Sequence, residues 1–211
     1  MKSVTRNDDQ LSYEDYGSAD DPCLLLLHGL GADHRMWKPQ IERYTEMGYR
    51  LLVPDLRGHG ESAGAIPGTI TDWVEDLEAI LDAERVQEYG LMGVSMGGVI
   101  AQGLALADRH RVRLLVLCDT FMDLESIGAK LLGWAILQSL RAYRVLGPQQ
   151  LAKLMTNAYK NSPEVAEYFH HVTVSCDLRQ IVRARKAINR VAHKEGLANL
   201  YVPTLHLVGE T

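Results

Sequence analysis

The sequence predicts an α/β protein in which a doubly wound, mostly parallel sheet is covered by helices on both faces. Short apolar runs alternate with amphipathic helical segments between residues 23 and 118, which is typical of parallel strands joined by helices. Helical patterns then fill residues 121–198, and one more apolar strand follows them. We therefore expect a core made of residues 1–120 and 199–211, with a helical cap, residues 121–198, inserted between two strands.

The first half of the chain supplies most of the predicted sheet. Two short strands joined by the polar turn Asn7–Asp9 come first, and runs of branched apolar residues then indicate buried strands. Thr71 and Asp72 are the N-cap candidates of the second helix. The expected strands cover residues 2–6, 10–16, 23–27, 49–53, 89–94 and 113–118, and the expected helices cover residues 35–47, 71–83 and 96–107.

The second half is predicted to be helical until its last strand. Gly147 and Pro148 separate a long apolar helix from the next one, because this pair interrupts helices. Residues 177–193 place apolar side chains on one face and five Arg or Lys on the other, which is typical of a helix with a solvated side. The expected helices cover residues 122–146, 149–159, 163–172 and 177–193, and the expected strand covers residues 202–209.

Composition and charge exclude several classes of protein. The chain has 211 residues, 46% of them hydrophobic, and its formal net charge is −5, which argues against non-specific nucleic-acid binding. No apolar run reaches the roughly 20 residues that span a bilayer. Cys23, Cys118 and Cys176 fit neither a disulfide framework nor a zinc pattern. We expect reduced thiols, a cytoplasmic location, and neither a metal nor an organic cofactor.

The most informative motif is Gly93-Val94-Ser95-Met96-Gly97, set between an apolar strand and a helix. Such a Gly-x-Ser-x-Gly turn lifts the serine out of the sheet, and its glycines remove the Cβ atoms that would clash there. Ser95 is therefore the candidate nucleophile. The Met96 amide lies at a helix N-terminus and is the first candidate donor to an oxyanion.

Two further segments support this interpretation. A buried strand, Leu24–Leu27, runs into His28-Gly29-Leu30-Gly31, where the Leu30 amide can supply a second oxyanion donor. Another strand ends in the glycine-rich polar loop Pro54–Ser62. We expect Asp55 and Arg57 to pair across this loop.

These three motifs, in this order, resemble the α/β-hydrolase family over most of the chain. The resemblance implies the α/β-hydrolase fold, with a helical cap over the nucleophile, and a chain order of serine, acid and histidine. The acid is then expected shortly after residue 208, and the histidine after one further strand, beyond Thr211. We therefore expect the chain to lack the triad histidine, the acid of the usual position, and the last strand and helix, and to self-associate through the exposed edge at residues 204–208.

The remaining candidates carry less specific signals. Asp119 follows a strand and is an alternative triad acid, although a short carboxylate there equally bonds loop amides. His34 and Trp134 are candidate substrate contacts, although Trp134 at helical spacing is also typical of packing. The glycine turns match neither a dinucleotide fingerprint nor a P-loop, because position 34 is histidine and no Lys-Ser/Thr pair follows residues 93–98.

The sequence favours a serine hydrolase that forms an acyl-enzyme at Ser95. By resemblance its substrate is a small-molecule carboxylic ester, lactone or similar acyl compound, with no nucleic-acid partner and no membrane span. Two alternatives use the same residues: a non-catalytic relative that binds a ligand beneath the cap, and a cofactor-free perhydrolase or haloperoxidase. A phosphonate probe that labels only activated serines distinguishes the catalytic from the non-catalytic case.

Overall fold

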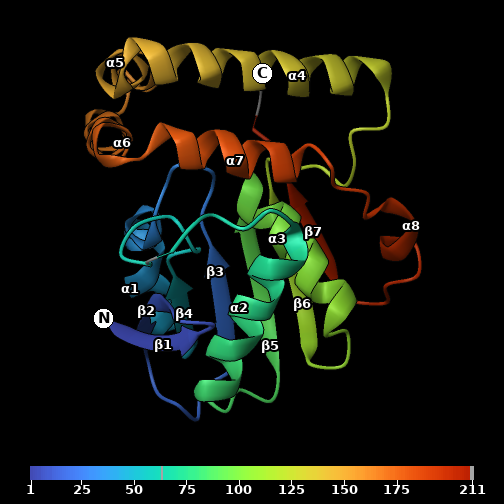
Figure 1. Ribbon diagram of the computed structural model, residues 1–211. Coiled ribbons are helices and arrows are strands. Elements are labelled where there is room, and N and C mark those ends of the chain that lie inside the picture. Colours follow the sequence, from blue (N-terminus) through green and yellow to red (C-terminus); the bar gives the residue numbers. More distant parts are fainter. Residues whose placement is uncertain (63, 210–211) are drawn as a thin grey trace.

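The computed structural model describes residues 1–62 and 64–209 and has the predicted architecture, a mostly parallel sheet with helices on both faces (Figure 1). The strands lie in the order β1-β2-β4-β3-β5-β6-β7. Strand β2 is antiparallel to β1 and β4, and the pairs from β4 to β7 are parallel. The strands are β1 (Lys2–Arg6), β2 (Asp9–Tyr16), β3 (Cys23–Leu27), β4 (Arg50–Pro54), β5 (Tyr89–Val94), β6 (Val112–Cys118) and β7 (Thr204–Leu207).

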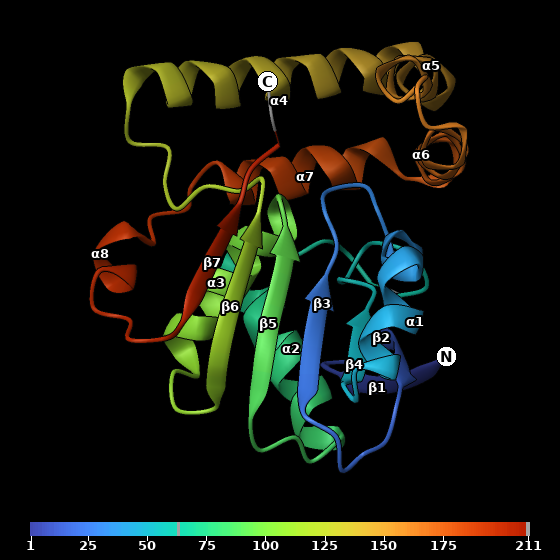
Figure 2. The ribbon, with the colours of Figure 1, turned by 180° about the vertical axis from the view of Figure 1, so that it is seen from behind.

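Both faces of the sheet are covered, as the doubly wound prediction requires. Helix α1 lies on one face, and α2 and α3 lie on the other (Figures 1 and 2). Strand β3 shows the division, because Leu25 and Leu27 pack with the residues of α2 and α3, whereas Leu24 and Leu26 pack with Trp37. The helices that flank the sheet are α1 (Lys38–Glu46), α2 (Ile70–Ala83) and α3 (Met96–Ala107).

Three helix starts differ from the sequence predictions. The segment after β3 begins as a 3₁₀ turn, His34–Trp37, in which the Asp33 carboxylate caps the Arg35 amide. The predicted N-cap at Thr71 or Asp72 was wrong. Thr69 caps α2 and Asp72 bonds back to the Thr69 amide, a reciprocal capping box that satisfies two otherwise free donors. The long helix begins at Ile127 rather than at residue 122, because the Ser126 hydroxyl accepts from the Ala129 amide.

A block of helices connects β6 to β7. Helices α4 to α7 lie above the strand ends in both views, with α7 next to the sheet and α4 beyond it (Figures 1 and 2). Helix α7 joins the main core through Ala184, Ala187 and Ile188. These elements are α4 (Ile127–Leu146), α5 (Pro148–Ala158), α6 (Pro163–Ser175), α7 (Leu178–Ile188) and α8 (Lys194–Leu197). The division of the chain into core and cap stays a prediction.

Strand β7 forms one edge of the described sheet. Its residues are all exposed, with Leu205 at 54% and Leu207 at 47% of their full accessibility. An exposed apolar edge is the feature from which self-association was predicted, and that prediction stays untested. The predicted acid position near Glu210 and Thr211 lies outside the described residues. None of the helices in residues 1–62 and 64–209 combines the length and apolarity needed to cross a bilayer.

Candidate active site

Ser95 occupies the corner between β5 and α3. Its backbone has φ +52° and ψ −112°, a conformation that side-chain-bearing residues rarely adopt and that costs of order 1–3 kcal/mol. A Cβ placed on Gly93 would lie 2.4 Å from the Gly97 carbonyl oxygen, and one placed on Gly97 would lie 2.3 Å from the Leu27 carbonyl oxygen. The two glycines are therefore required by the close approach of the backbones, as the motif predicts.

Hydrogen bonds from β6 and its loop hold this strained corner. The Ser95 amide donates to the Cys118 carbonyl oxygen at 2.9 Å. The Thr120 hydroxyl donates to the Ser95 carbonyl oxygen at 2.7 Å, and the Val99 amide donates to the same oxygen at 3.1 Å. The main chain of Ser95 is thus fixed on both sides, while its side chain makes no hydrogen bond within residues 1–62 and 64–209.

The loop after β3 passes beside Ser95. A Cβ placed on Gly29 would lie 3.8 Å from the Ser95 Cβ and 3.7 Å from the Val94 carbonyl oxygen. In the part of the chain that the structure describes, the amides of Leu30 and Met96 donate no hydrogen bond to the protein. The two segments that meet at Ser95 therefore each carry a main-chain N–H group without a protein acceptor. A pair of free N–H groups is what an oxyanion site requires.

His28 braces the loop that carries Leu30. Its Nε2 accepts from the Leu56 amide at 3.0 Å, so its Nδ1 carries the hydrogen and donates to the Gly29 carbonyl oxygen at 2.8 Å. Burial lowers the pKa of His28, which keeps the ring neutral and preserves this pattern. The predicted structural role of this histidine is confirmed.

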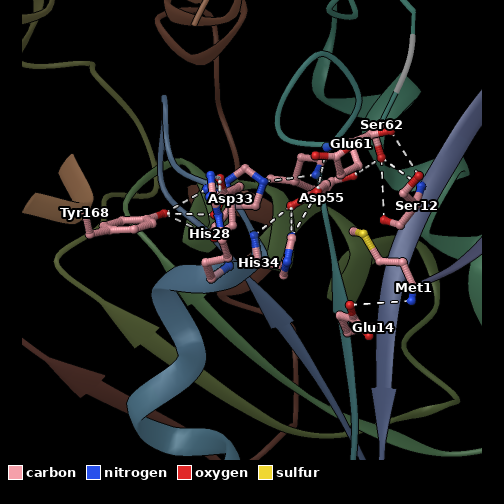
Figure 3. A network of polar contacts seen from close by, with 12 residues as sticks. Met1, Ser12, Glu14, His28, Asp33, His34, Asp55, Glu61, Ser62 and Tyr168 are labelled. Atoms are coloured by element: carbon pink, nitrogen blue, oxygen red, sulfur yellow. Dashed lines mark hydrogen bonds and ion pairs between the residues drawn. The ribbon is translucent and has the colours of Figure 1, made fainter. Parts of the chain in front are cut away.

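A buried polar network continues from this loop (Figure 3). Asp55 accepts from the His34 amide at 2.6 Å, from His34 Nδ1 at 2.9 Å and from the Glu61 amide at 2.8 Å. Burial alone would raise the pKa of Asp55. The hydrogen bonds to its carboxylate outweigh this effect and hold the pKa below its ordinary value, and the bond from the His34 ring contributes most. The bond to Asp55 likewise raises the pKa of His34.

The same network reaches the helices above the sheet. The Tyr168 hydroxyl of α6 accepts from the Asp33 amide at 3.0 Å (Figure 3). The Asp33 carboxylate accepts from the Arg35 guanidinium at 3.1 Å. Ligand atoms of Asp33, His34 and Asp55 all lie within 4.8 Å of one another, close enough to share a metal ion. Each already has a protein partner, so the cluster has the character of a brace between the Leu30 loop and the helices.

His34 and Trp134, the two predicted substrate contacts, have surroundings that leave their role open to test. His34 is turned onto Asp55, and it borders an open surface pocket of about 560 Å³ beside Lys2, Gln10 and Ser12. Trp134 is 60% exposed on α4, and α7 lies between α4 and the sheet (Figure 2). Neither position tests a contact with substrate, and both residues stay predictions.

Asp119 lies at the sheet end that also carries Ser95. Its φ is +44°, its amide donates to the Leu207 carbonyl oxygen at 2.9 Å, and its carboxylate accepts from the Gly209 amide at 2.9 Å. This is the loop-bonding arrangement that was one of its two predicted roles. Its role as an alternative triad acid is untested, because across residues 1–62 and 64–209 no histidine is hydrogen bonded to it or to Ser95.

Three features of the site differ from the sequence predictions or were missed by them. The predicted Asp55–Arg57 pair was wrong. Arg57 instead forms ion pairs with Asp76 and with Asp9, and its Nη1 lies 2.6 Å from Asp9 Oδ2. Thr120 was not identified, although its position directly after Asp119 places it at the strand end next to the Ser95 turn. Nothing in the sequence indicates the bonds between Tyr168 and Asp33, which lie 135 residues apart.

Comparison with known proteins agrees with this geometry. The family model described as the alpha/beta hydrolase fold matches residues 22–160. RutD of Variovorax paradoxus, named for carbamate hydrolysis, is 31% identical over 92% of this chain and 76% of its own. The 3-oxoadipate enol-lactonase 2 of Acinetobacter baylyi is 27% identical over 98% of this chain and 78% of its own.

Solved structures give the same result. A thermophilic esterase from Thermogutta terrifontis superposes with a TM-score of 0.83 at 30% identity, covering 99% of this chain and 80% of that one. The enol-lactonase from Burkholderia xenovorans LB400 has a TM-score of 0.82 at 25% identity, covering 97% and 80%. The sheet order, the Ser95 corner and these matches lead to one conclusion: the chain belongs to the α/β-hydrolase family.

Proposed function

We propose that the protein is a hydrolase of carboxylic esters, lactones or similar acyl compounds, with Ser95 as the nucleophile. The relatives named for esterase, enol-lactonase and carbamate hydrolase activity support the general reaction, hydrolysis at an acyl carbon. The observation that carries the specific proposal is the strained Ser95 corner, which is followed by the Met96 amide and lies beside Gly29, the residue before Leu30.

In the first half of the reaction, Ser95 Oγ attacks the acyl carbon as a base removes its proton. The carbonyl oxygen becomes an oxyanion that accepts hydrogen bonds from the Leu30 and Met96 amides. Each such donor contributes about 10²- to 10³-fold to the rate in comparable sites. Return of the proton to the leaving alkoxide breaks the ester bond and releases an alcohol. In a lactone the alcohol stays attached to the acyl group.

In the second half, water hydrolyses the acyl-enzyme. The base takes a proton from water, the resulting hydroxide attacks the same carbon, and the Ser95 Oγ–acyl bond breaks as Oγ regains a proton. The products are the free acid and the restored serine. The same two amides hold the second oxyanion, so no further group is needed for charge stabilisation.

Within residues 1–62 and 64–209 no histidine is hydrogen bonded to Ser95, so these residues do not identify the base. The family resemblance puts an acid shortly after β7 and a histidine further along the chain, with Asp119 as the alternative acid. A serine hydroxyl needs such a base, because it is a weak nucleophile when protonated. We further propose that α4–α7 form a cap over Ser95, and that Trp134 and His34 contact the substrate.

The proposed substrate is a small acyl compound, and the proposed location is cytoplasmic. Cys23, Cys118 and Cys176 are all free thiols, which is typical of a reducing compartment. Burial raises the pKa of Cys23 to about 12, so this thiol stays protonated and is no competing nucleophile.

Hydrolysis of p-nitrophenyl esters by the full-length protein tests the proposal. Ser95→Ala is expected to lower kcat by at least about 10³-fold, because the nucleophile is removed. Ser162→Ala is the matched control, since Ser162 is exposed and its side chain caps no backbone amide. Activity that survives in Ser95→Ala would refute the nucleophile. A folded wild-type protein that retains a ligand but never hydrolyses any ester would instead favour the non-catalytic alternative.

A further inference from the structure

Arg185 on α7 is a half-buried cation without an anionic partner in the described chain. Its Nε is buried and has no hydrogen-bond acceptor, and its guanidinium forms no ion pair with a carboxylate of residues 1–62 and 64–209. Desolvation lowers the pKa of Arg185 below its ordinary value, without removing its charge at neutral pH. A buried cation is normally paired, because desolvating a charge costs free energy that only a partner repays.

The neighbours of Arg185 along α7 show where its side chain lies. Residues four apart share one face of a helix, so Ile181, Arg185 and Asn189 form one stripe. At one end of this stripe, Ile181 Cδ1 would lie 3.9 Å from a Cβ placed on Gly31, next to the Leu30 amide. At the other end, Asn189 Nδ2 donates to the Gly133 carbonyl oxygen of α4 at 3.1 Å.

Arg185 therefore lies between the loop that carries Leu30 and the middle of α4. Side chains on a helix lean toward its N-terminus, which directs Arg185 toward Ile181 and the Leu30 loop rather than toward α8. Figures 1 and 2 show α7 crossing above the ends of the strands. One of these strands is β5, whose last residue, Val94, precedes Ser95. From this helix geometry we infer that the guanidinium lies on the side of α7 that faces the Leu30 loop.

The charge distribution points in the same direction. Residues 121–198 contain eleven Lys and Arg and six Asp and Glu, a formal charge of +5, whereas the rest of the chain has a formal charge of −10. Most of the cations on α7, such as Arg183 and Lys186, are exposed to solvent, whereas Arg185 is half-buried. A positive block above an active site attracts anionic substrates and raises their local concentration.

We propose that Arg185 binds a carboxylate of the substrate, so that the preferred substrates are acyl compounds that carry a second, ionised carboxyl group near the scissile carbonyl. This inference rests on the proposed hydrolase function and deepens it. The guanidinium fork supplies two parallel N–H donors that match the two carboxylate oxygens. The bound anion replaces the water that Arg185 loses on burial. An ester in which hydrogen replaces this carboxylate leaves the cation unpaired and binds less tightly.

The test compares two esters in the full-length protein. Mono-p-nitrophenyl glutarate carries a free carboxylate, and p-nitrophenyl butyrate is its neutral counterpart. We expect wild type to prefer the glutarate ester in kcat/KM. Arg185→Gln is expected to reduce kcat/KM for the glutarate ester about 10- to 100-fold, mainly through KM, as for a lost charged hydrogen bond. The same variant is expected to change the butyrate ester less than twofold.

Two controls separate binding from structure. Lys186→Gln removes the neighbouring exposed cation and is expected to leave both esters unchanged, because its charge is solvated. Arg185→Lys is expected to recover only part of the glutarate activity, because an ammonium lacks the planar fork. The melting temperature of Arg185→Gln is expected to be unchanged or higher than that of wild type, because an unpaired buried charge is removed.

Each outcome distinguishes this inference from the proposed function. Equal losses on both esters, or a lower melting temperature, would show that Arg185 is structural. Hydrolysis of both esters with an unchanged preference would overturn the carboxylate site and leave the hydrolase intact. If neither ester is hydrolysed, titration of Ser95→Ala with glutarate gives the answer without catalysis. Binding that Arg185→Gln loses supports the site, and equal binding or no binding refutes it.

Discussion

The Thr120 hydroxyl donates to the Ser95 carbonyl oxygen at 2.7 Å, and this bond joins the end of β6 to the corner that carries the proposed nucleophile. Ser95 keeps a positive φ only while its surroundings hold it there, because the relaxed backbone prefers a negative value. The loop after β6 therefore supports the backbone of the proposed active site through Thr120.

Thr120→Val tests this support, because valine keeps the shape of threonine and removes the hydroxyl. We expect the free energy of unfolding to fall by about 1 kcal/mol and ester hydrolysis to slow by about fivefold. Thr120→Ser keeps the donor and should retain most of the activity. Urea titration and initial rates give both values, and identical rates for the valine and serine variants would contradict the supporting role.

Gly97→Ala tests the packing of α3 against the end of β3. The added Cβ would lie 2.3 Å from the Leu27 carbonyl oxygen and 2.6 Å from the His28 carbonyl oxygen, and backbone atoms cannot rotate away. We expect a loss of about 3 kcal/mol in stability and a displaced Leu30 loop. Gly128→Ala on α4 is the matched control, because its Cβ would meet nothing within 4 Å. That variant should be up to about 1 kcal/mol more stable.

We predict that acid lowers the free energy of unfolding, because the fold contains buried neutral histidines. Burial lowers the pKa of His59 to about 3, compared with about 6.5 in the unfolded chain. The unfolded state therefore binds the proton first, so the stabilising contribution of neutral His59 is complete above pH 6.5 and is lost as the pH falls toward 3. The predicted slope is about 1.4 kcal/mol per pH unit for this residue.

His59→Phe isolates this contribution, because it keeps an aromatic ring beside His28 and removes the titrating group. Unfolding free energies measured from pH 7 to pH 4.5 should fall less steeply for this variant than for wild type, by about 1.4 kcal/mol per unit. Parallel curves would show that His59 does not titrate on unfolding.

We predict a large loss of stability when the Arg50 side chain is removed, although Arg50 begins β4 and lies away from the candidate active site. Its side chain is 5% exposed and pairs with Asp15 at 2.8 Å and with Glu84. Removing it leaves two poorly solvated carboxylates, for which the exposed Lys2 is the remaining cation and the Tyr13 hydroxyl a further donor to Glu84, so Arg50→Met should lose about 3 kcal/mol in stability. Arg113→Met is the control, because its pair with Glu88 is exposed on both sides and should contribute nothing measurable. Equal melting temperatures for the two variants would contradict this interpretation.

The features that the sequence predicted are those set by neighbouring residues. The Ser95 corner follows from glycines two positions to each side, and the parallel strands follow from unbroken apolar runs such as Leu24–Leu27. The order of elements follows from their alternation. These signals are local, so the composition of each segment was enough to recover the fold and the position of the candidate nucleophile.

The features that the sequence missed depend on partners far apart in the chain. Asp55 bonds His34 rather than Arg57, because the loop after β3 brings a ring and an amide to the end of β4. Arg57 turns instead to Asp76, 19 residues away. Helical periodicity shows that α7 has an apolar face, but it does not show what lies opposite that face, so the position of Arg185 became visible only in the structure.

The most direct test of the central claim is labelling of the full-length protein with a fluorophosphonate probe, followed by identification of the modified residue by mass spectrometry. We predict a single adduct on Ser95, absent from Ser95→Ala and from heat-denatured protein. A folded, ester-hydrolysing protein that carries the adduct on another residue, or that stays unlabelled, would contradict the assignment of Ser95 as the nucleophile.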